Sequence, residues 1–404
     1  MAVGSWQNSK LKTQNSKLQP MNTQKITLSK IAPVLLAFFV MSFVDLVGII
    51  VDRVSSDMNL SATVAQLIPS AIFLWFFLLS VPIGVLQARI GKRKMLNIGM
   101  GVTALGLLVP WLFYSFAMVM VGAALLGIGN TIVQVSANPL LVDVVPGNRR
   151  SSFLSFSQFV KAIGSMLGAP LAALFAAQFG DWKILFLVFG IVSVLAVLWL
   201  GNVKIDETRQ EGFKVSIGSS FKLLGNNFIL LMVLSIFLVV GVDVGFNSNS
   251  GQFLIKRFGI EQVAAESGRS IYFLGRMLGT FLGAIMLTKI SSNKFFMWTS
   301  LLGILFLVTI LLIKSSALAW VLIFLIGLAV ANIWPLVFSI AVGKYPERSN
   351  EISGLMMMAI SGGAVIPLLV GWIGEISNLS IGMLVLVACM IYLWIVSMYC
   401  LKKE

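Results

Sequence analysis

The stretch that decides the fold is Leu126–Pro170, LGIGNTIVQVSANPLLVDVVPGNRRSSFLSFSQFVKAIGSMLGAP. It reads as an apolar helix interrupted by polar residues, a short basic turn, and a second apolar helix with a lysine near its middle. In hydrocarbon, groups such as Gln134, Asn138 and Lys161 are costly and normally face a partner or a water-filled cavity. Pro139 also removes a backbone donor in mid-helix, and the freed carbonyl must be satisfied by protein or by a cavity. The stretch therefore predicts a polar path lined by helices, as in a transporter.

The composition is that of a helical membrane protein. Of the 404 residues, 58% are hydrophobic and only 11% are charged, and the mean hydropathy is +0.97. Soluble domains carry about 25% charged residues. Apolar runs of roughly 20 residues, each long enough to cross about 30 Å of hydrocarbon, recur along the whole chain. Transmembrane barrels show weakly alternating segments instead, so we expect membrane-spanning helices.

The charge and the missing residue types exclude several classes of function. A net charge of +14 is typical of nucleic-acid binding, but here the basic residues lie in short loops between apolar runs. We therefore expect the lipid bilayer, and no nucleic acid, as a partner. Histidine is absent, which removes the usual catalytic base and the commonest metal ligand. We expect no enzyme, no cofactor and no metal site, and any proton carrier must be a carboxylate.

Twelve membrane spans are predicted, six on each side of the longest loop. Their bounds are 30–53, 62–89, 94–113, 115–145, 151–179, 183–202, 227–257, 261–289, 294–314, 317–344, 350–375 and 379–401. The polar N-terminal segment lacks the apolar core of a signal peptide and is expected to be disordered. The predicted units are a cytoplasmic tail (1–27), an N-terminal six-helix bundle (28–202), a cytoplasmic linker (203–226) and a C-terminal six-helix bundle (227–404).

The distribution of basic residues predicts the orientation in the membrane. Most of the 29 Lys and Arg residues fall on the tail, the linker and the loops that share their side. Because basic loops stay in the cytoplasm, both termini are predicted to be cytoplasmic. A multi-pass protein of a bacterial inner membrane, expected to be a monomer, fits this pattern. Cys389 and Cys400 lie about 16 Å apart along one predicted helix and are predicted to be packing residues.

The two halves of the chain repeat each other in a consistent register. The aligned segments are Ser70–Lys94 with Ser270–Lys294, Val44-Asp45 with Val242-Asp243, and Pro139-Leu140 with Pro335-Leu336. Parallel six-helix halves with a site between them near the bilayer midplane are one of the known arrangements of secondary transporters. The repeat therefore predicts an all-α fold of two pseudo-symmetric six-helix bundles.

Several motifs resemble a known group of proteins. The order of spans and the loop GVLQARIGKRK (84–94) resemble the major facilitator superfamily, and further motifs are similar to its fucose:proton symporter family. These motifs are the polar residue before Asn-Pro in 134–139, LSFSQFVKAIGSMLG (154–168), FLGRMLGT (273–280), WPLVFSIAV (334–342) and ISGGAVIPLL (360–369). The resemblance covers nearly the whole chain and implies the twelve-helix major facilitator fold and sugar transport.

The chain departs from the family pattern at charged positions. The superfamily loop usually has an aspartate where Ala88 stands, and the family glutamate implicated in proton coupling is Gln134 here. The family carboxylate of span one aligns near Gly48, one turn from Asp45. The Gly-x-(Glu/Gln) of span seven ends in Asp243. The resemblance therefore leaves the coupling ion, H⁺ or Na⁺, open.

Asp45 and Lys161 are predicted to touch each other near the bilayer midplane. Asp45 lies about 15 residues into span one and Lys161 about 11 residues beyond the basic turn before span five, which places both at similar depth. One interpretation is a static pair that offsets the cost of burying two charges. The other gives the pair a gating or substrate-sensing role, or makes Asp45 the carrier of the coupling cation. A nearby ammonium favours the charged carboxylate, so protonation would require the pair to break during transport.

Asp243 and Arg276 form the matching constellation in the second half. Asp243 lies in mid-span seven and is followed by several amides, whose density predicts local unwinding or hydration of the helix. We favour Asp243 as the cation-coupling carboxylate, with Asp45 as the other candidate. Arg276 either takes part in the site or only ties helices together, because a guanidinium can satisfy several carbonyls.

Sugar hydroxyls require partners that both donate and accept hydrogen bonds, and amides do both. The candidate substrate-binding residues are Gln134, Asn138, Gln158, Lys161, Asn247, Asn249 and Asn332, together with Trp75 and Trp334 as aromatic faces. Most aromatic residues of such a chain face lipid or fill the core. Trp334 is the better of the two because it precedes a mid-helix proline.

The sequence thus predicts a secondary active transporter that imports a monosaccharide or a small glycoside by alternating access, coupled to H⁺ or Na⁺. Alternatives are an uncoupled sugar facilitator and a carrier of anionic sugars that uses Lys161 or Arg276 for a carboxylate. A multidrug exporter and a non-transporting membrane sugar receptor are more remote. A membrane enzyme is disfavoured because no nucleophile–base pair is visible without histidine.

Overall fold

The computed structural model describes residues 28–60, 64, 67–205, 207, 216–260 and 262–402. Within these ranges the regular structure is helical. Eleven helices of this part of the chain are long and apolar enough to cross a membrane, and the shorter apolar helix Ser270–Met286 supplies the twelfth span. The predicted tail and most of the predicted linker lie outside the described residues, so the unit boundaries stay predictions.

The helices follow one another with short connections. The first half contains α2 (Leu28–Met41), η1 (Ser42–Leu46), α3 (Val47–Met58), α5 (Leu67–Ile90), α6 (Lys92–Leu112), α7 (Phe116–Val144), η2 (Gly147–Arg149), α8 (Arg150–Phe179) and α9 (Ile184–Asn202). Between the halves lie α10 (Ile217–Lys222) and η3 (Leu223–Gly225). The second half contains α11 (Asn227–Phe258), α12 (Gln262–Met286), α13 (Ser292–Leu312), α14 (Ser316–Val330), α15 (Ile333–Lys344), η4 (Pro346–Arg348), α16 (Ser349–Met358), η5 (Ala359–Ser361), α17 (Gly362–Ile376), α18 (Leu379–Gly382) and α19 (Leu384–Leu401).

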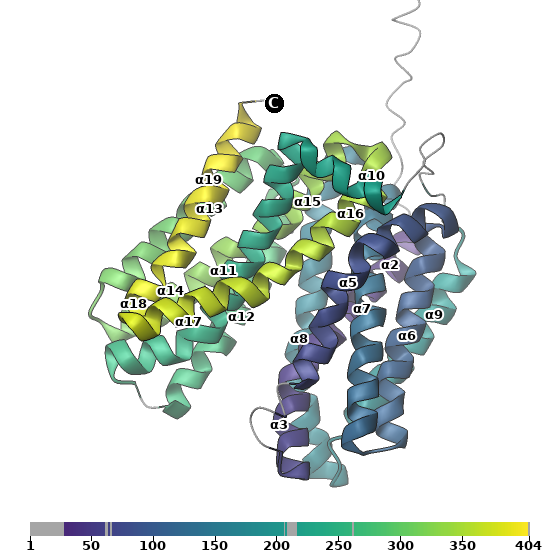
Figure 1. Cartoon of the computed structure of the whole chain (residues 1–404), viewed down its shortest axis with the longest axis horizontal. Helices are drawn as coiled ribbons and strands as arrows, with labels where there is room; N and C mark the ends of the chain where they lie inside the picture. The colour runs from purple at the N-terminus through teal and green to yellow at the C-terminus, as the bar shows by residue number, and fades with distance from the viewer. Residues whose placement is uncertain are drawn as a thin grey trace, which may run out of the picture.

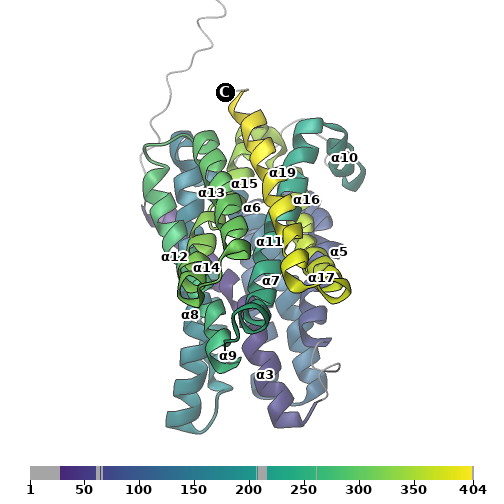
Figure 2. The same cartoon turned by 90° about the vertical axis from the view of Figure 1, so that its left-hand side faces the viewer.

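The two halves form two bundles that meet at one end. Figure 1 shows α2–α9 as one bundle and α11–α19 as the other, drawn together where α10 and the C-terminus lie and diverging toward the opposite end. The view turned by 90° shows the helices running between these two ends, with α3 reaching the lower one (Figure 2). We call the end that carries α10 and the C-terminus the linker end, and the opposite end the far end.

Local signals in the sequence account for many helix ends. Ser115 begins α7 by accepting a hydrogen bond from the Met118 backbone N–H, and Asn226 does the same for two N–H groups of α11. Such side-chain caps satisfy donors that the first turn leaves free. Gly180 and Gly259 end α8 and α11 in the left-handed conformation that glycine adopts without strain.

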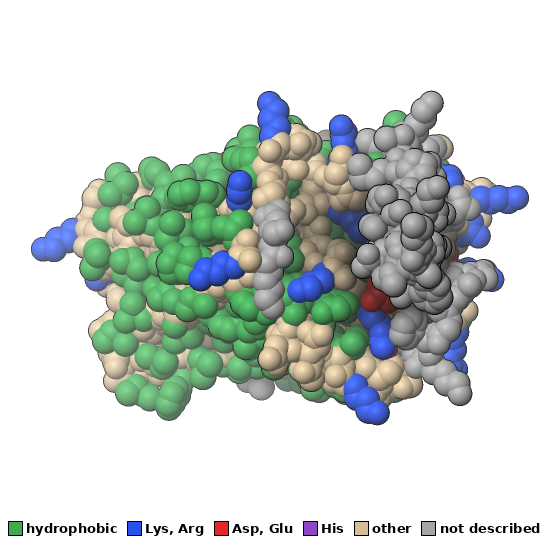
Figure 3. Space-filling model, turned by 90° about the horizontal axis from the view of Figure 1, so that it is seen from above, with side chains coloured by type: hydrophobic (Ala, Val, Ile, Leu, Met, Phe, Trp, Pro, Cys, Tyr) green, Lys and Arg blue, Asp and Glu red, His purple; other side chains and the backbone are tan. Residues whose placement is uncertain are grey.

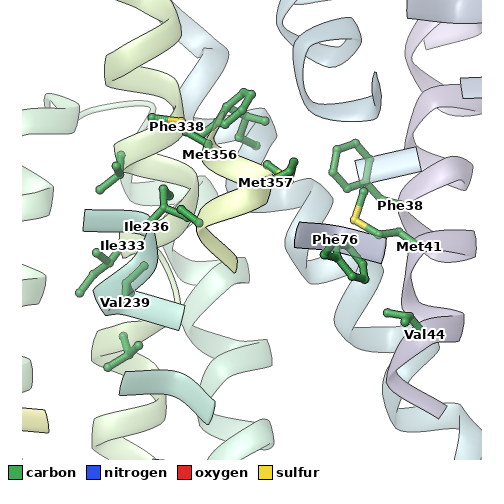
Figure 4. Close-up of a cluster of buried hydrophobic side chains, with 14 of the residues drawn as sticks. Phe38, Met41, Val44, Phe76, Ile236, Val239, Ile333, Phe338, Met356 and Met357 are labelled. Carbon is green, nitrogen blue, oxygen red and sulfur yellow. The ribbon is translucent and has the colours of Figure 1, made fainter. Parts of the chain in front are cut away.

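The buried apolar side chains of the two bundles belong to one cluster. Figure 4 shows Phe38, Met41 and Phe76 of the first bundle and Met356 and Met357 of the second as parts of it. Met358 is partly buried against the same cluster. The free thiols of both cysteines are also buried, as predicted for packing residues.

Three spans are broken where the sequence predicted continuous helices. Span one changes to the 3-10 helix η1 at Ser42–Leu46, span ten turns at Ala331 and Asn332, and span eleven changes to η5 at Ala359–Ser361. Short 3-10 stretches inside a helix often mark a hinge or a site under functional constraint.

Span seven is not broken, and the predicted unwinding at its amides is wrong. The helix α11 continues through Asp243 and the amides that follow it. Asn249 donates to the Gly245 carbonyl of its own helix at 2.8 Å. An amide that bonds to the preceding turn is compatible with helical backbone, which is why the polar run does not unwind.

The carbonyl freed by Pro139 is satisfied across the bundle interface. Proline has no N–H to donate to the residue four positions earlier, which here is Val135. Ser353 of α16 donates its hydroxyl to this carbonyl at 2.6 Å. Of the two possibilities that the sequence left open, protein or a cavity, the structure shows protein, and the donor comes from the other bundle.

Further hydroxyls and glycines close the linker end. Ser151 of α8 is 2.8 Å from the hydroxyl of Ser339 and 2.6 Å from that of Ser292. Gly84 and Gly354 bring α5 and α16 into backbone contact, because a Cβ on Gly84 would lie 2.7 Å from the Asn350 carbonyl oxygen. The bundles are therefore held at this end by short polar contacts and close helix packing.

The far end carries a polar cluster on the extension of span one. The Asp57 carboxylate accepts hydrogen bonds from the Tyr114 hydroxyl at 2.7 Å and from the Trp182 indole at 2.9 Å. Partial burial disfavours the charged carboxylate, but the two hydrogen bonds and the nearby Lys183 outweigh it and lower the pKa of Asp57. These contacts tie α3 to its own bundle.

Replacing Ser353 by alanine should loosen the linker end. Ser353→Ala leaves the Val135 carbonyl without its donor only while the bundles are closed there, at a cost of about 1–3 kcal/mol. Hydrogen–deuterium exchange in the turns 146–150 and 345–348 should rise. Ser397→Ala is the control, because Ser397 donates to Trp394 within α19. Unchanged exchange in Ser353→Ala would show that this bond does not hold the bundles together.

Candidate functional site

Asp45 lies in the 3-10 break of span one and contacts span five. Its Oδ2 atom is 3.3 Å from the Lys161 ammonium and accepts a hydrogen bond from the Ser165 hydroxyl at 2.6 Å. The side chains of Asp45 and Lys161 remain 37% and 22% exposed. The predicted Asp45–Lys161 contact is confirmed. Ser165 was not predicted, although it lies four residues after Lys161 and therefore on the same helix face.

Asp243 of α11 is held by two donors from α12. Arg276 Nη1 donates to Oδ2 and the Tyr272 hydroxyl donates to Oδ1, each at 2.7 Å. Tyr272 is fully buried, whereas Asp243 and Arg276 are 20% and 29% exposed. The two donors are four residues apart and share one helix face. The structure thus joins the predicted pair and adds a tyrosine that composition alone did not single out.

The two ion pairs lie on helices that pack against each other across the bundle interface. Lys161 is on α8 and Arg276 is on α12, and these two helices are in contact, with the ring centroids of Phe159 and Phe281 5.1 Å apart. Two carboxylates and two cations therefore form one electrically neutral group, which we call the charge quartet: Asp45, Lys161, Asp243 and Arg276.

Amides of α7 support the break that carries Asp45. Gln134 donates to the Asn130 side chain, and Asn130 donates to the carbonyl of Met41, the last residue of α2, each at 2.8 Å. Asn138 donates to the Gln134 carbonyl at 2.8 Å. This ladder ties α7 to the point where span one changes to η1. Asn130 was missed by sequence reasoning, although its four-residue spacing from Gln134 is typical of one helix face.

The remaining predicted amides lie between helices or along their own helix. Asn332 is buried, donates to the Gly279 carbonyl at 2.7 Å and packs against Gly283. Its carbonyl oxygen, like those of Asn138 and Asn247, is buried and has no hydrogen-bond partner in the described part of the chain. Buried acceptors of this kind are normally satisfied by water or a ligand.

The two candidate tryptophans contact residues outside the charge quartet. Trp75 packs against Gly127, and Trp334 stacks on Phe338 with ring centroids 5.5 Å apart. Gln158 of α8 is half-buried. The structure thus brings together the charged candidates, while the substrate-binding roles of the amides and aromatics stay predictions.

The chain belongs to the Major Facilitator Superfamily, whose model matches residues 34–368. A glucose/galactose transporter from Brucella abortus biovar 1 (strain 9-941) is 25% identical over 380 residues, which is 89% of this chain and 90% of that protein. The chain is therefore a multi-pass integral membrane protein and a transporter rather than an enzyme.

Solved structures share the fold. The fucose:proton symporter of Escherichia coli, in a structure of its outward conformation, superposes with a TM-score of 0.82 at 16% identity, covering 92% of this chain and 98% of that chain. A proton:xylose symporter superposes with a TM-score of 0.72 at 14% identity, covering 93% and 95%. The predicted all-α fold of two six-helix bundles is confirmed.

Breaking the Asp243–Arg276 pair should destabilise the protein more than breaking a surface pair of equal length. Arg276→Gln leaves a partly buried carboxylate without its cation, at a cost of about 1–3 kcal/mol, and should lower the melting temperature of the purified protein. Lys183→Gln is the comparison, because Lys183 and Asp181 are also 2.7 Å apart, but the carboxylate left behind is 39% exposed in Asp181 and only 20% exposed in Asp243. A solvated surface pair contributes about 0–1 kcal/mol.

The double variant Arg276→Gln with Asp243→Asn separates charge from packing. Neutralising both partners removes the uncompensated carboxylate, so the double variant should melt above the single Arg276→Gln variant. Equal melting temperatures for Arg276→Gln and Lys183→Gln would contradict the assignment of Arg276 to a desolvated pair.

Proposed function

We propose that this protein imports a neutral monosaccharide or a small glycoside across a bacterial inner membrane by alternating access, driven by H⁺ or Na⁺. The observation that carries the proposal is the charge quartet. Two partly exposed ion pairs, one from each bundle, lie at the interface of bundles that are closed only at the linker end. Intramembrane ionisable groups of this kind mark substrate and ion pathways.

The charge balance and the relatives favour a neutral sugar. Both cations of the quartet already have a carboxylate partner at 3.3 Å or less, so no net charge is left to attract an ionic substrate. The glucose/galactose transporter and the two symporters compared above are named for neutral sugars, whereas a hexuronate transporter of Bacillus subtilis matches only 40% of this chain at 26% identity.

The orientation of the protein follows from its basic residues. Figure 3 shows Lys and Arg side chains spread over the linker end, where the basic turns of the sequence gather. The positive-inside rule assigns this end and both termini to the cytoplasm. The bundles then diverge toward the outside, and the similar fucose:proton symporter structure is an outward conformation.

The geometry of the two carboxylates suggests different roles in coupling. Both oxygens of Asp243 are held by 2.7 Å bonds from Tyr272 and Arg276, and a bound cation would have to replace these bonds. Asp45 is more exposed and its ion pair is longer. Both remain candidates, and we place Asp45 first because less must be broken before it can exchange a cation.

Two alternatives make different use of the same groups. An uncoupled facilitator would keep both pairs as static supports, and gradients would then not change the final sugar level. A carrier of anionic sugars would use Lys161 or Arg276 for a carboxylate, which requires an existing pair to open. The pairing of both cations in this structure favours the neutral substrate.

Uptake into proteoliposomes tests transport and coupling together. We expect accumulation of at least one of glucose, galactose and fucose, raised by an inward H⁺ or Na⁺ gradient. Asp45→Asn should abolish gradient-driven accumulation but retain sugar exchange between two equal pools, because exchange does not require the empty carrier to reorient. Asp57→Asn, at the far end, is the control and should accumulate sugar like the wild type.

The outcomes separate the candidates. Equal accumulation by Asp45→Asn and the wild type, with loss in Asp243→Asn, would move the coupling role to Asp243. Uptake that ignores both gradients would identify a facilitator. Sugar binding without flux would identify a receptor and contradict the transport proposal.

A further inference from the structure

We propose that Asp45 is a selectivity residue. Its carboxylate pairs with the Lys161 ammonium, so that the site accepts neutral sugars and rejects sugar acids. Removing the charge of Asp45 then uncovers a binding site for a sugar carboxylate at the Lys161 ammonium. This inference rests on the proposed sugar transport and concerns the state in which Asp45 is paired with Lys161, before a coupling cation binds; it adds which sugars that state admits.

The Asp45–Lys161 contact has the form of an ion pair that a ligand can replace. The Nζ–Oδ2 distance is 3.3 Å, longer than the 2.7–2.9 Å of a strong charge-assisted hydrogen bond. The same Oδ2 atom also accepts from Ser165, so the carboxylate uses one oxygen for both partners. A lysine ammonium has three donors, and Lys161 retains donors that can bind a carboxylate.

The other cation of the quartet is less available. Arg276 donates to Asp243 at 2.7 Å, and the second oxygen of that carboxylate is fixed by Tyr272, also at 2.7 Å. A ligand carboxylate would have to displace an ion pair with shorter bonds and more of them. Lys161 is therefore the cation that a change at Asp45 releases.

The charge balance of the quartet predicts that neutral sugars bind more tightly than sugar acids. A sugar hydroxyl leaves the quartet neutral, whereas a sugar carboxylate brings a third negative charge next to Asp45. Like charges at short distance repel, and they do so more strongly in a partly buried site than in bulk water. Asp45→Asn leaves the quartet with one uncompensated positive charge at Lys161, and a bound carboxylate then restores neutrality.

Glucose and glucuronate provide a matched pair of probes. They share the ring and differ only at C6, which carries a hydroxymethyl group in one and a carboxylate in the other. Equilibrium binding to purified protein is the measurement, because it does not require Asp45 to support coupled uptake. We expect the wild type to prefer glucose, and Asp45→Asn to shift the glucuronate-to-glucose affinity ratio by about tenfold or more toward glucuronate.

Two controls assign the shift to Lys161. The double variant Asp45→Asn with Lys161→Met has the same net charge in the quartet as the wild type but no free ammonium, and its affinity ratio should not move toward glucuronate. The methyl ester of glucuronate has the shape of the acid without its charge, so its affinity should not rise in Asp45→Asn. If Asp45→Asn is not recovered as a monodisperse protein, Asp45→Ser makes the same test.

The results distinguish this inference from the function on which it rests. A wild type that binds glucose, together with an Asp45→Asn variant whose affinity ratio is unchanged, overturns the selectivity role and leaves sugar transport intact. An equal shift in the double variant also overturns it, because Lys161 would not be the site. A wild type that binds none of the neutral sugars overturns both proposals.

Discussion

Hydrocarbon offers no water to a charge, and this constraint organises the structure. Asp45, Lys161, Asp243 and Arg276 each lie in an apolar helical segment of the membrane-spanning bundles, and each has a partner of opposite sign in its own bundle. Pairing offsets most of the desolvation that burial would otherwise impose. The two pairs lie on helices that pack against each other across the bundle interface, and all four side chains remain partly exposed. A neutral quartet can change its water contacts without leaving an isolated charge in the membrane.

The contacts that close the linker end are of a different kind. Hydroxyls such as Ser151 and Ser353 and the backbone contact of Gly84 with Gly354 hold the bundles together there. A single hydrogen bond of this kind contributes only about 0.5–1.5 kcal/mol net, because water can replace it once the interface opens. The ion pairs Lys92–Asp143 and Arg348–Glu351 each lie within one bundle. An interface of replaceable bonds is compatible with the alternating access that we propose.

Much of this arrangement follows from the sequence, and the rest depends on rotation of the helices. The depth of Asp45 and Lys161 is fixed by counting residues from basic turns, which is why their contact was predicted. Sequence spacing does not show which face of a largely apolar helix points toward the site. Tyr272 and Asn130 were therefore not distinguished from core residues. Ser42–Leu46 contains no glycine or proline that would have predicted the 3-10 break at Asp45. Conversely, the amides after Asp243 look disruptive in the sequence, but Asn249 bonds to its own helix.

The measurement that tests this account most directly is a pair of distances between spin labels across the bundles. Labels at Leu112 and Leu312, both exposed at the far end, report closure there, and labels at Ile90 and Lys289 report opening at the linker end. Cys389→Ala and Cys400→Ala remove the native thiols from the labelled protein. With saturating glucose or galactose, the far-end distance should shorten and the linker-end distance should lengthen in part of the population. Distances at both ends that stay fixed, or that change in the same direction, while sugar is bound would contradict alternating access around the charge quartet.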